Sequence, residues 1–130
     1  MKGFGIEPHQ IKKNIKKTSS QRIQIINLAI KLHSQGKIKE AKKYYQYCIN
    51  QGFNDHKIFS NFGIILQSEG KFKEAEILYR KVTQINPNFI EGYLNLGNIL
   101  RIVGKFKEAE ISYRKATQIN PNFIEGHLNL

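Results

Sequence analysis

Apolar residues recur three and four positions apart along most of the chain, which is the spacing of one helical face. Between residues 90 and 102 the stripe consists of Tyr93, Leu96, Gly97 and Leu100. A second stretch, at about 105–118, carries a similar stripe made of Phe106, Ala109, Tyr113, Ala116 and Ile119. The pattern therefore predicts two consecutive helices.

Glycine, proline and asparagine punctuate these helices. Gly104 lies where a left-handed residue ends the first helix, and Asn120-Pro121 stops the second. Asn88 and Asn122 are each followed three residues later by a glutamate, Glu91 or Glu125, which resembles a capping box. The two asparagines are therefore predicted to cap the helices that follow them.

The whole hairpin repeats with a period of 34 residues. The block 70–92 returns as 104–126 with two differences, Leu78/Ser112 and Val82/Ala116, and an older copy begins at Gly36. The register is 22–55, 56–89 and 90–123, and 124–130 begin a fourth unit. Interrupting glycines and prolines argue against a β repeat or one long coiled coil. The predicted fold class is all-α.

The repeated positions resemble the tetratricopeptide repeat (TPR) family, whose unit has an aromatic, then Leu-Gly, a turn glycine, two alanines around an aromatic, and a proline at fixed offsets. The first repeat has Gly52-Phe53 where the others have Asn-Pro. The resemblance covers 22–130 and implies a solenoid of antiparallel helical hairpins in a right-handed superhelix, with three full repeats and the start of a fourth. In the third repeat the matching residues are Tyr93, Leu96, Gly97, Leu100, Gly104, Ala109, Tyr113, Ala116 and Pro121.

An asparagine recurs at the sixth position of every unit, on a face that in this family lines the concave groove. Its amide offers a donor and an acceptor to the backbone of an extended peptide. The row resembles the asparagine ladder of the O-GlcNAc transferase TPR superhelix, and Asn98 adds to it. The other interpretation is a repeat residue that caps or bridges locally. The recurring residues are Asn27, Asn61, Asn95 and Asn129.

A second groove mode of the family holds a C-terminal carboxylate between basic residues and asparagines. Lys57 and Arg101 are the candidates for it beside Asn61, Asn95 and Asn98, although the fifth position of each repeat is not basic. The groove is otherwise rather apolar, so an apolar peptide or a partner's helix fits it as well as an acidic tail. Its apolar candidates are Ile23, Ile26, Ile30, Ile64, Leu94 and Ile102.

Charge is unevenly distributed over the 130 residues, a one-domain length with 21 Lys and Arg against 10 Asp and Glu. Of the net charge of +11, residues 1–21 carry +4 and the first repeat carries another +4. Residues 1–21 form a basic arm that is predicted to be flexible or a short helix. The arm lacks aromatic residues interleaved with the lysines, so a solvated tail is favoured over nucleic acid or anionic lipid. On the second helices, the pairs Glu76/Arg80 and Glu110/Arg114 and the neighbouring lysines at 71, 73, 105 and 107 indicate a solvated outer face.

Catalytic and metal-binding constellations are not apparent in the sequence. The histidines lack ligand spacing, and Cys48 at a small-residue position of the first repeat is favoured as a buried structural thiol. No cofactor and no enzyme activity are expected. The N-terminus lacks an apolar signal segment and no apolar run is long enough to span a bilayer, so the predicted location is cytoplasmic.

Two functions follow as hypotheses. The first is a non-catalytic interaction scaffold that binds a peptide or partner segment in its concave groove. The second is the N-terminal recognition part of a larger modifying enzyme of glycosyltransferase, sulfotransferase or methyltransferase type, since similar arrays precede such domains in bacteria. The unfinished fourth repeat ending at Leu130 also leaves self-association through the open end as a possibility.

Overall fold

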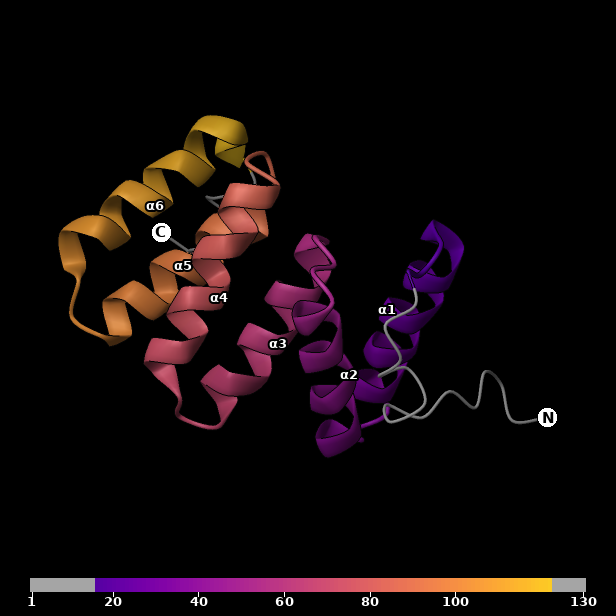
Figure 1. Cartoon of the computed structure of the whole chain (residues 1–130). Helices are drawn as coiled ribbons and strands as arrows, with labels where there is room; N and C mark the ends of the chain where they lie inside the picture. Colours follow the sequence, from indigo (N-terminus) through magenta and orange to yellow (C-terminus); the bar gives the residue numbers. More distant parts are fainter. Residues whose placement is uncertain (1–15, 123–130) are drawn as a thin grey trace. The chain divides into compact units, whose positions relative to one another are not determined.

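The computed structural model describes residues 16–122, and within this range the chain forms six α-helices (Figure 1). Neighbouring helices pair in chain order as three hairpins, α1 with α2, α3 with α4 and α5 with α6, so the predicted all-α fold is confirmed. The chain divides between Asn54 and Asp55 into two compact units. The helices are α1 (Ser19–Ser34), α2 (Ile38–Asn50), α3 (His56–Ser68), α4 (Phe72–Ile85), α5 (Ile90–Ile102) and α6 (Phe106–Ile119).

The first unit is the hairpin of α1 and α2. Its first helix begins at Ser19, ahead of the repeat register at Arg22, because Thr18 and Gln21 form a reciprocal capping box. The Gln21 backbone N–H donates to the Thr18 hydroxyl at 3.1 Å, and the Thr18 N–H donates to the Gln21 side-chain oxygen at 2.8 Å. Between the helices, Ala29 and Cys48 are fully buried, so the prediction of a buried structural thiol is confirmed.

Phe53 takes the place that proline has in the other two repeats. Its ring packs edge-on against Tyr47, with 6.1 Å between the ring centroids. The Arg22 guanidinium lies 5.1 Å from the centre of the same ring. Gly52 precedes it with a φ of 76°, a left-handed conformation that turns the chain without a proline.

The second unit contains two hairpins, and glycines close each of them. At the end of α5 the Gly104 N–H donates to the Arg101 carbonyl at 3.1 Å, and the Lys105 N–H donates to the Leu100 carbonyl at 2.8 Å. With Gly104 at φ 85°, this is a Schellman ending. The predicted bounds of α5 are confirmed, and α6 begins and ends one residue later than predicted.

Close approach within each hairpin is made at one small residue of the first helix. A Cβ added at Gly97 would lie 2.7 Å from the Tyr113 ring, and one at Gly63 would lie 2.6 Å from the Tyr79 ring. The first repeat has Ala29 and Tyr45 at these positions, both fully buried. The tyrosine thus fills the space that the small residue leaves.

Helix α5 packs against both α4 and α6, so the two hairpins of the second unit are continuous. Gly92 allows the contact with α4, because a Cβ there would lie 2.9 Å from the Val82 side chain. On the other side Leu94 and Ala116 are buried together, with Tyr93 and Tyr113 packed against them. α5 therefore contributes buried residues to its interfaces with both α4 and α6.

The predicted cap of α5 by Asn88 is wrong. The N-cap residue is Phe89, which makes no side-chain cap hydrogen bond. The Phe89 N–H donates to the Asn86 carbonyl at 3.1 Å, so the turn after Pro87 carries the chain one residue beyond the asparagine before the helix starts. Pro121 and Asn122 are themselves helical, so Asn122 does not precede the next helix as its cap.

Candidate functional site

Three of the predicted groove asparagines lie in the second unit, on α3 and α5. Asn61 and Asn95 occupy equivalent positions in these helices, and Asn98 lies one turn after Asn95; all three are partly exposed. We call Asn61, Asn95 and Asn98 the amide face. Asn27 is exposed on α1 in the first unit, and Asn129 lies outside the described residues.

The three amides of this face differ in their hydrogen bonds. The Asn61 Nδ2 donates to the Lys57 carbonyl one turn earlier, at 2.8 Å, which matches the local bridging interpretation for this residue. The Asn98 Oδ1 accepts a hydrogen bond from the Tyr113 hydroxyl. Within the described residues the Asn95 side chain makes no hydrogen bond, so its donor and acceptor are both available.

Apolar side chains accompany the amides. Ile64 on α3 is 43% exposed and Ile102 on α5 is 47% exposed, values that few isoleucines reach in a folded core. By contrast Leu94, predicted to face the groove, is buried between α5 and α6. Of the candidates in the first unit, Ile23 is exposed and Ile26 is buried. The amide face is therefore accompanied, on the same two helices, by the exposed aliphatic side chains of Ile64 and Ile102.

Two basic residues flank the amide face. Lys57 is exposed, and its ammonium lies 3.3 Å from the Asp55 carboxylate, which also caps α3 by accepting from the Lys57 N–H. Arg101 is exposed near the other end of α5. Burial raises the pKa of Tyr113, and the Arg101 charge opposes that rise.

A tyrosine hydroxyl joins the two helices of every hairpin. Tyr79 donates to the Gln67 side-chain oxygen at 2.8 Å, and the Tyr45 hydroxyl lies 3.3 Å from His33 Nδ1. Burial raises the pKa of Tyr79 to about 12 and lowers that of His33. These groups are therefore neutral at physiological pH and hold the first helix of each hairpin in place.

The sequence predicts that Glu76 belongs to a solvated outer face, and this prediction is wrong. Its side chain is 9% exposed and lies between two hairpins, where it accepts from Arg80 at 2.8 Å and from Lys105 at 2.9 Å. Arg80 also reaches Glu108 of the next hairpin at 2.8 Å. The four residues form an ion-pair network that ties α4 to the start of α6.

Burial and the surrounding positive charges have opposite effects on the pKa of Glu76. Burial alone would raise it, but the hydrogen bonds and charges of Lys105 and Arg80 outweigh burial, and the pKa lies below its ordinary value. The equivalent pair on α6 behaves as the sequence predicts. Glu110 and Arg114 are 65% and 71% exposed and lie 3.4 Å apart. The same local sequence therefore has two environments within the described residues: Glu76 contacts the next hairpin, and Glu110 is exposed.

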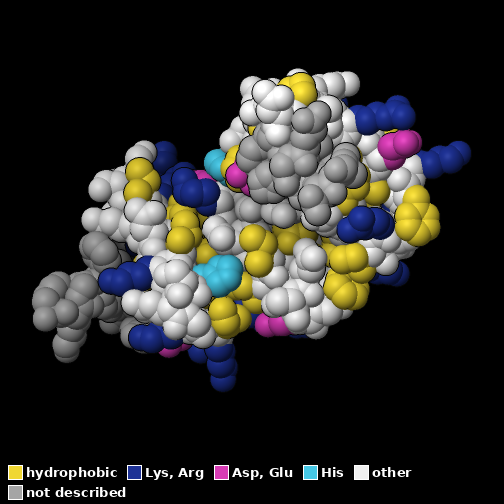
Figure 2. All heavy atoms as spheres, turned by 180° about the vertical axis from the view of Figure 1, so that it is seen from behind, with side chains coloured by type: hydrophobic (Ala, Val, Ile, Leu, Met, Phe, Trp, Pro, Cys, Tyr) yellow, Lys and Arg dark blue, Asp and Glu magenta, His cyan; other side chains and the backbone are white. Residues whose placement is uncertain are grey.

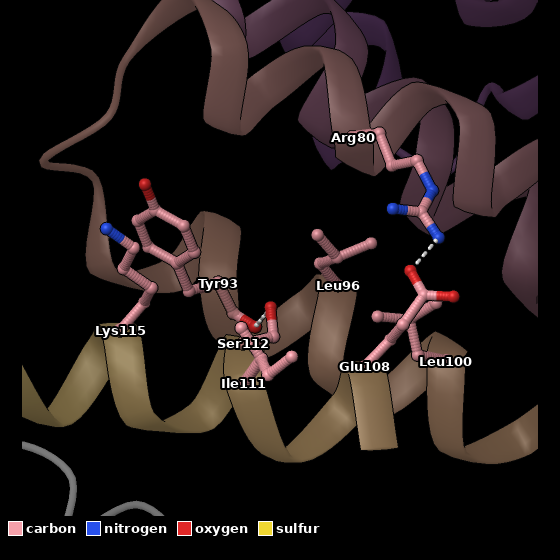
Figure 3. A pocket seen from close by; sticks show the side chains of 8 residues that line it. All are labelled: Arg80, Tyr93, Leu96, Leu100, Glu108, Ile111, Ser112 and Lys115. Carbon is pink, nitrogen blue, oxygen red and sulfur yellow. Dashed lines mark hydrogen bonds and ion pairs between the residues drawn. The ribbon is translucent and has the colours of Figure 1, made fainter. Parts of the chain in front are cut away.

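A pocket between α4, α5 and α6 was not foreseen from the sequence. It has a volume of about 220 Å³ and is lined by side chains of α4, α5 and α6 (Figure 3). Its sequence signal is the replacement of Leu78 by Ser112 at the same repeat position. The lining residues are Arg80, Tyr93, Leu96, Leu100, Glu108, Ile111, Ser112 and Lys115.

The surface charge is mainly basic. In the first unit Glu40 is the single acidic residue between positions 16 and 54, among several lysines. Figure 2 shows dark blue Lys and Arg side chains projecting from the face in view, with few acidic ones among them. Residues 1–15, which hold most of the predicted basic arm, lie outside the described part of the chain.

Neither a metal-ligand group nor a membrane-spanning helix occurs among residues 16–122. In that range no group of three His, Cys, Asp or Glu side chains is placed to hold a metal ion. None of the six helices there combines the length and apolar character needed to cross a bilayer.

The hairpin geometry and the 34-residue register define a helical-repeat protein, and comparison with known families identifies the class. Tetratricopeptide repeat profiles match residues 56–89 and 90–123, more than half of the chain and in the register predicted above. The chain belongs to the tetratricopeptide repeat family. Its six helices make three repeats.

Solved structures with the same fold include two kinds of protein. The chain is similar to the Yersinia enterocolitica type III secretion translocator chaperone SycD, with 21% identity, a TM-score of 0.73, and coverage of 88% of this chain and 85% of that one. The complex of SycD with a peptide of the translocator YopD gives 22% identity, a TM-score of 0.72, and coverage of 86% and 88%.

The second kind is the second TPR of Spaghetti (RPAP3) bound to the HSP90 peptide SRMEEVD. It gives 18% identity, a TM-score of 0.71, and coverage of 78% of this chain and 89% of that one. At these identities the likeness concerns the fold. No curated protein sequence matches the chain. The resemblance of the asparagines to those of O-GlcNAc transferase stays a prediction.

Proposed function

We propose that the chain is a protein-interaction module that holds an extended segment of a partner protein on the amide face. The observation that carries the proposal is the Asn95 side chain, partly exposed on α5 and without a hydrogen-bond partner among the described residues. An extended peptide has one unpaired N–H and one unpaired C=O per residue, which an amide can pair with simultaneously.

The neighbouring residues suit the same ligand. Asn61 uses one amide hydrogen on the Lys57 carbonyl, and its oxygen stays available to a peptide N–H. The Asn98 Oδ1 accepts from the Tyr113 hydroxyl, so the Asn98 NH2 group is available to donate to a peptide carbonyl. The exposed Ile64 and Ile102 provide apolar contact for alternate side chains of the peptide.

The likeness to SycD and to RPAP3 supports this proposal, because both were solved with a peptide of another protein. The RPAP3 peptide is acidic, and Lys57 and Arg101 would complement such a ligand. However, Lys57 is already paired with Asp55, and the fifth repeat positions, Ser60 and Leu94, are buried. Backbone pairing by amides is therefore favoured over a carboxylate clamp.

Binding rather than catalysis is the proposed activity. The alternative, a recognition segment of a larger modifying enzyme, would use the same face to present a substrate. It stays a prediction that the sequence beyond Leu130 would test: a catalytic domain there would support it, and a stop codon would contradict it.

A peptide selection tests the proposed face. Displayed random dodecamers selected on the chain should include binders whose affinity falls about tenfold in Asn95→Ala, the loss expected for one or two hydrogen bonds of about 1 kcal/mol each. The matched control is Asn88→Ala, an exposed asparagine in the loop before α5. Fluorescence anisotropy measures both. Equal affinity in the Asn95 and Asn88 variants would contradict the proposal.

A further inference from the structure

The pocket between α4, α5 and α6 is separate from the amide face. Its lining includes Leu96 and Leu100 of α5, both buried, and the exposed Ile111 of α6 (Figure 3). A cavity of about 150 Å³ lined by aliphatic side chains holds a benzene molecule. A pocket of about 220 Å³ therefore has room for a leucine or phenylalanine side chain.

The pocket exists where the third repeat departs from the second. Within the 23-residue block shared by both repeats, Ser112 stands at the position of Leu78 and Ala116 at that of Val82. Ser112 is 4% exposed and lines the pocket, with its hydroxyl donating to the Tyr93 carbonyl at 3.1 Å. A serine in place of a leucine removes aliphatic volume, and the bond to Tyr93 satisfies its buried hydroxyl.

The two ends of the pocket differ in charge. At one end the Arg80 guanidinium is neutralised by Glu76 and Glu108. At the other end Tyr93 and Lys115 project beside each other (Figure 3). Within the described residues Lys115 has no ion-pair partner and the Tyr93 hydroxyl makes no hydrogen bond. This end therefore offers an ammonium and a hydroxyl donor to a carboxylate.

We propose that this pocket binds an acidic segment of a partner protein, with a leucine or phenylalanine side chain between Leu96 and Ile111. A neighbouring Asp or Glu carboxylate of that segment accepts hydrogen bonds from Lys115 and Tyr93. The chain's basic surface favours an acidic partner in the same way. The site is independent of the proposed amide face, because none of the three asparagines of that face lines it.

The test is a titration of the isotopically labelled full chain with short peptides, followed by amide chemical shifts. The probe is acetyl-Glu-Leu-Glu-amide, and the comparison peptides are acetyl-Gln-Leu-Gln-amide and acetyl-Glu-Ala-Glu-amide. The expected result is saturable shifts around Tyr93, Ser112 and Lys115, with either comparison peptide binding about fivefold or more weakly. Shifts confined to α3 and the amide face, or no saturable shift, would overturn the proposal.

Two substitutions of Ser112 distinguish the effect of filling the pocket from the effect of removing the Ser112 hydroxyl. Ser112→Leu restores the residue that the second repeat carries and should reduce binding about tenfold or more, while Ser112→Ala leaves the space open and should retain binding within about threefold. Far-ultraviolet circular dichroism checks that both variants fold. Equal binding by Ser112→Leu and the unmodified chain would overturn the site.

Charge reversal tests the carboxylate end. Lys115→Glu should weaken the Glu-Leu-Glu peptide about fivefold or more and leave the Gln-Leu-Gln peptide unchanged. The matched control is Lys81→Glu, because Lys81 is the equivalent residue of the preceding repeat and does not line the pocket. The same loss in both variants, or the same loss for both peptides, would show that Lys115 does not recognise the carboxylate.

Discussion

At the scale of single residues, Glu76 and Glu110 show how a repeat uses the same glutamate in two ways. Both follow the sequence Phe-Lys-Glu-Ala, and both have an arginine four residues later. Glu76 is almost buried because the next hairpin covers it and supplies Lys105, whereas Glu110 is mostly exposed. The contribution of each glutamate to stability should differ accordingly.

Glu76→Gln is predicted to lower the free energy of unfolding by about 1–2 kcal/mol, between the values typical of exposed and fully buried ion pairs. The loss is limited because Arg80 retains Glu108. Glu110→Gln, the matched control, should cost less than about 0.5 kcal/mol. Urea unfolding followed by circular dichroism measures both, and equal losses would contradict the bridging role of Glu76.

The lowered pKa of Glu76 predicts that the stability of the fold depends on pH. Because the pKa of Glu76 is lower in the folded chain than its ordinary value of 4.5, its carboxylate stabilises the fold above that pH. The stabilisation is lost as the pH falls through the lowered pKa. The advantage of the unmodified chain over Glu76→Gln should therefore be constant from about pH 6 to 8 and shrink below about pH 4.5. An advantage that grows on acidification would contradict this assignment.

Sequence reasoning reached part of this residue-level picture. The pairs Glu76/Arg80 and Glu110/Arg114 were correctly recognised as ion pairs, but the burial of Glu76 depends on a neighbouring hairpin rather than on local spacing. The change from Leu78 to Ser112 was visible as well. Its consequence needed the knowledge that this position lies over α5, beside Tyr93.

At the scale of helices and turns, the sequence predicts the bounds of α5 and, to within one residue, those of α6, because strong local signals mark them. Left-handed glycines end α3 and α5, and Asn-Pro ends α4 and α6. α5 begins at the predicted residue, but its predicted N-cap, Asn88, is wrong, because the turn after Pro87 places Phe89 at the cap position. The capping box of Thr18 and Gln21 has the Thr-x-x-Gln spacing that is typical of a helix start.

Gly104→Ala tests the turn that closes the last hairpin. A Cβ at this position meets no atom within 4 Å, so the cost comes from the left-handed φ of 85° and should be about 1 kcal/mol. Gly104→Asn should cost less, because asparagine adopts this conformation more readily. Thermal unfolding compares the two variants. A stabilising Ala substitution would contradict the left-handed turn.

At the scale of the whole molecule, the second unit has a central helix and an outer one. α5 is packed by α4 and α6, whereas within the described residues α6 is packed mainly by α5. In a repeat array each element is stabilised by its immediate neighbours, so protection should follow this order. The second unit should therefore be most stable near α5.

Native-state hydrogen exchange tests this order. Amides in the middle of α5 are expected to exchange more slowly than those in the middle of α6, because opening α6 leaves α4 and α5 paired. The expected difference is about tenfold or more, equivalent to about 1.4 kcal/mol of opening free energy. Slower exchange in α6 than in α5 would contradict the proposed distribution of stability.

The central claim, that a partner segment lies along the amide face, is tested most directly by mapping where a selected peptide binds. The chain is Ser112→Leu, which closes the pocket between α4 and α6, and the measurement is the change in amide chemical shifts on adding the peptide. The account predicts the largest changes on α3 and α5 around Asn61, Asn95 and Asn98, and their loss in Asn95→Ala. Changes confined to α4 and α6, or unaffected by Asn95→Ala, would contradict it.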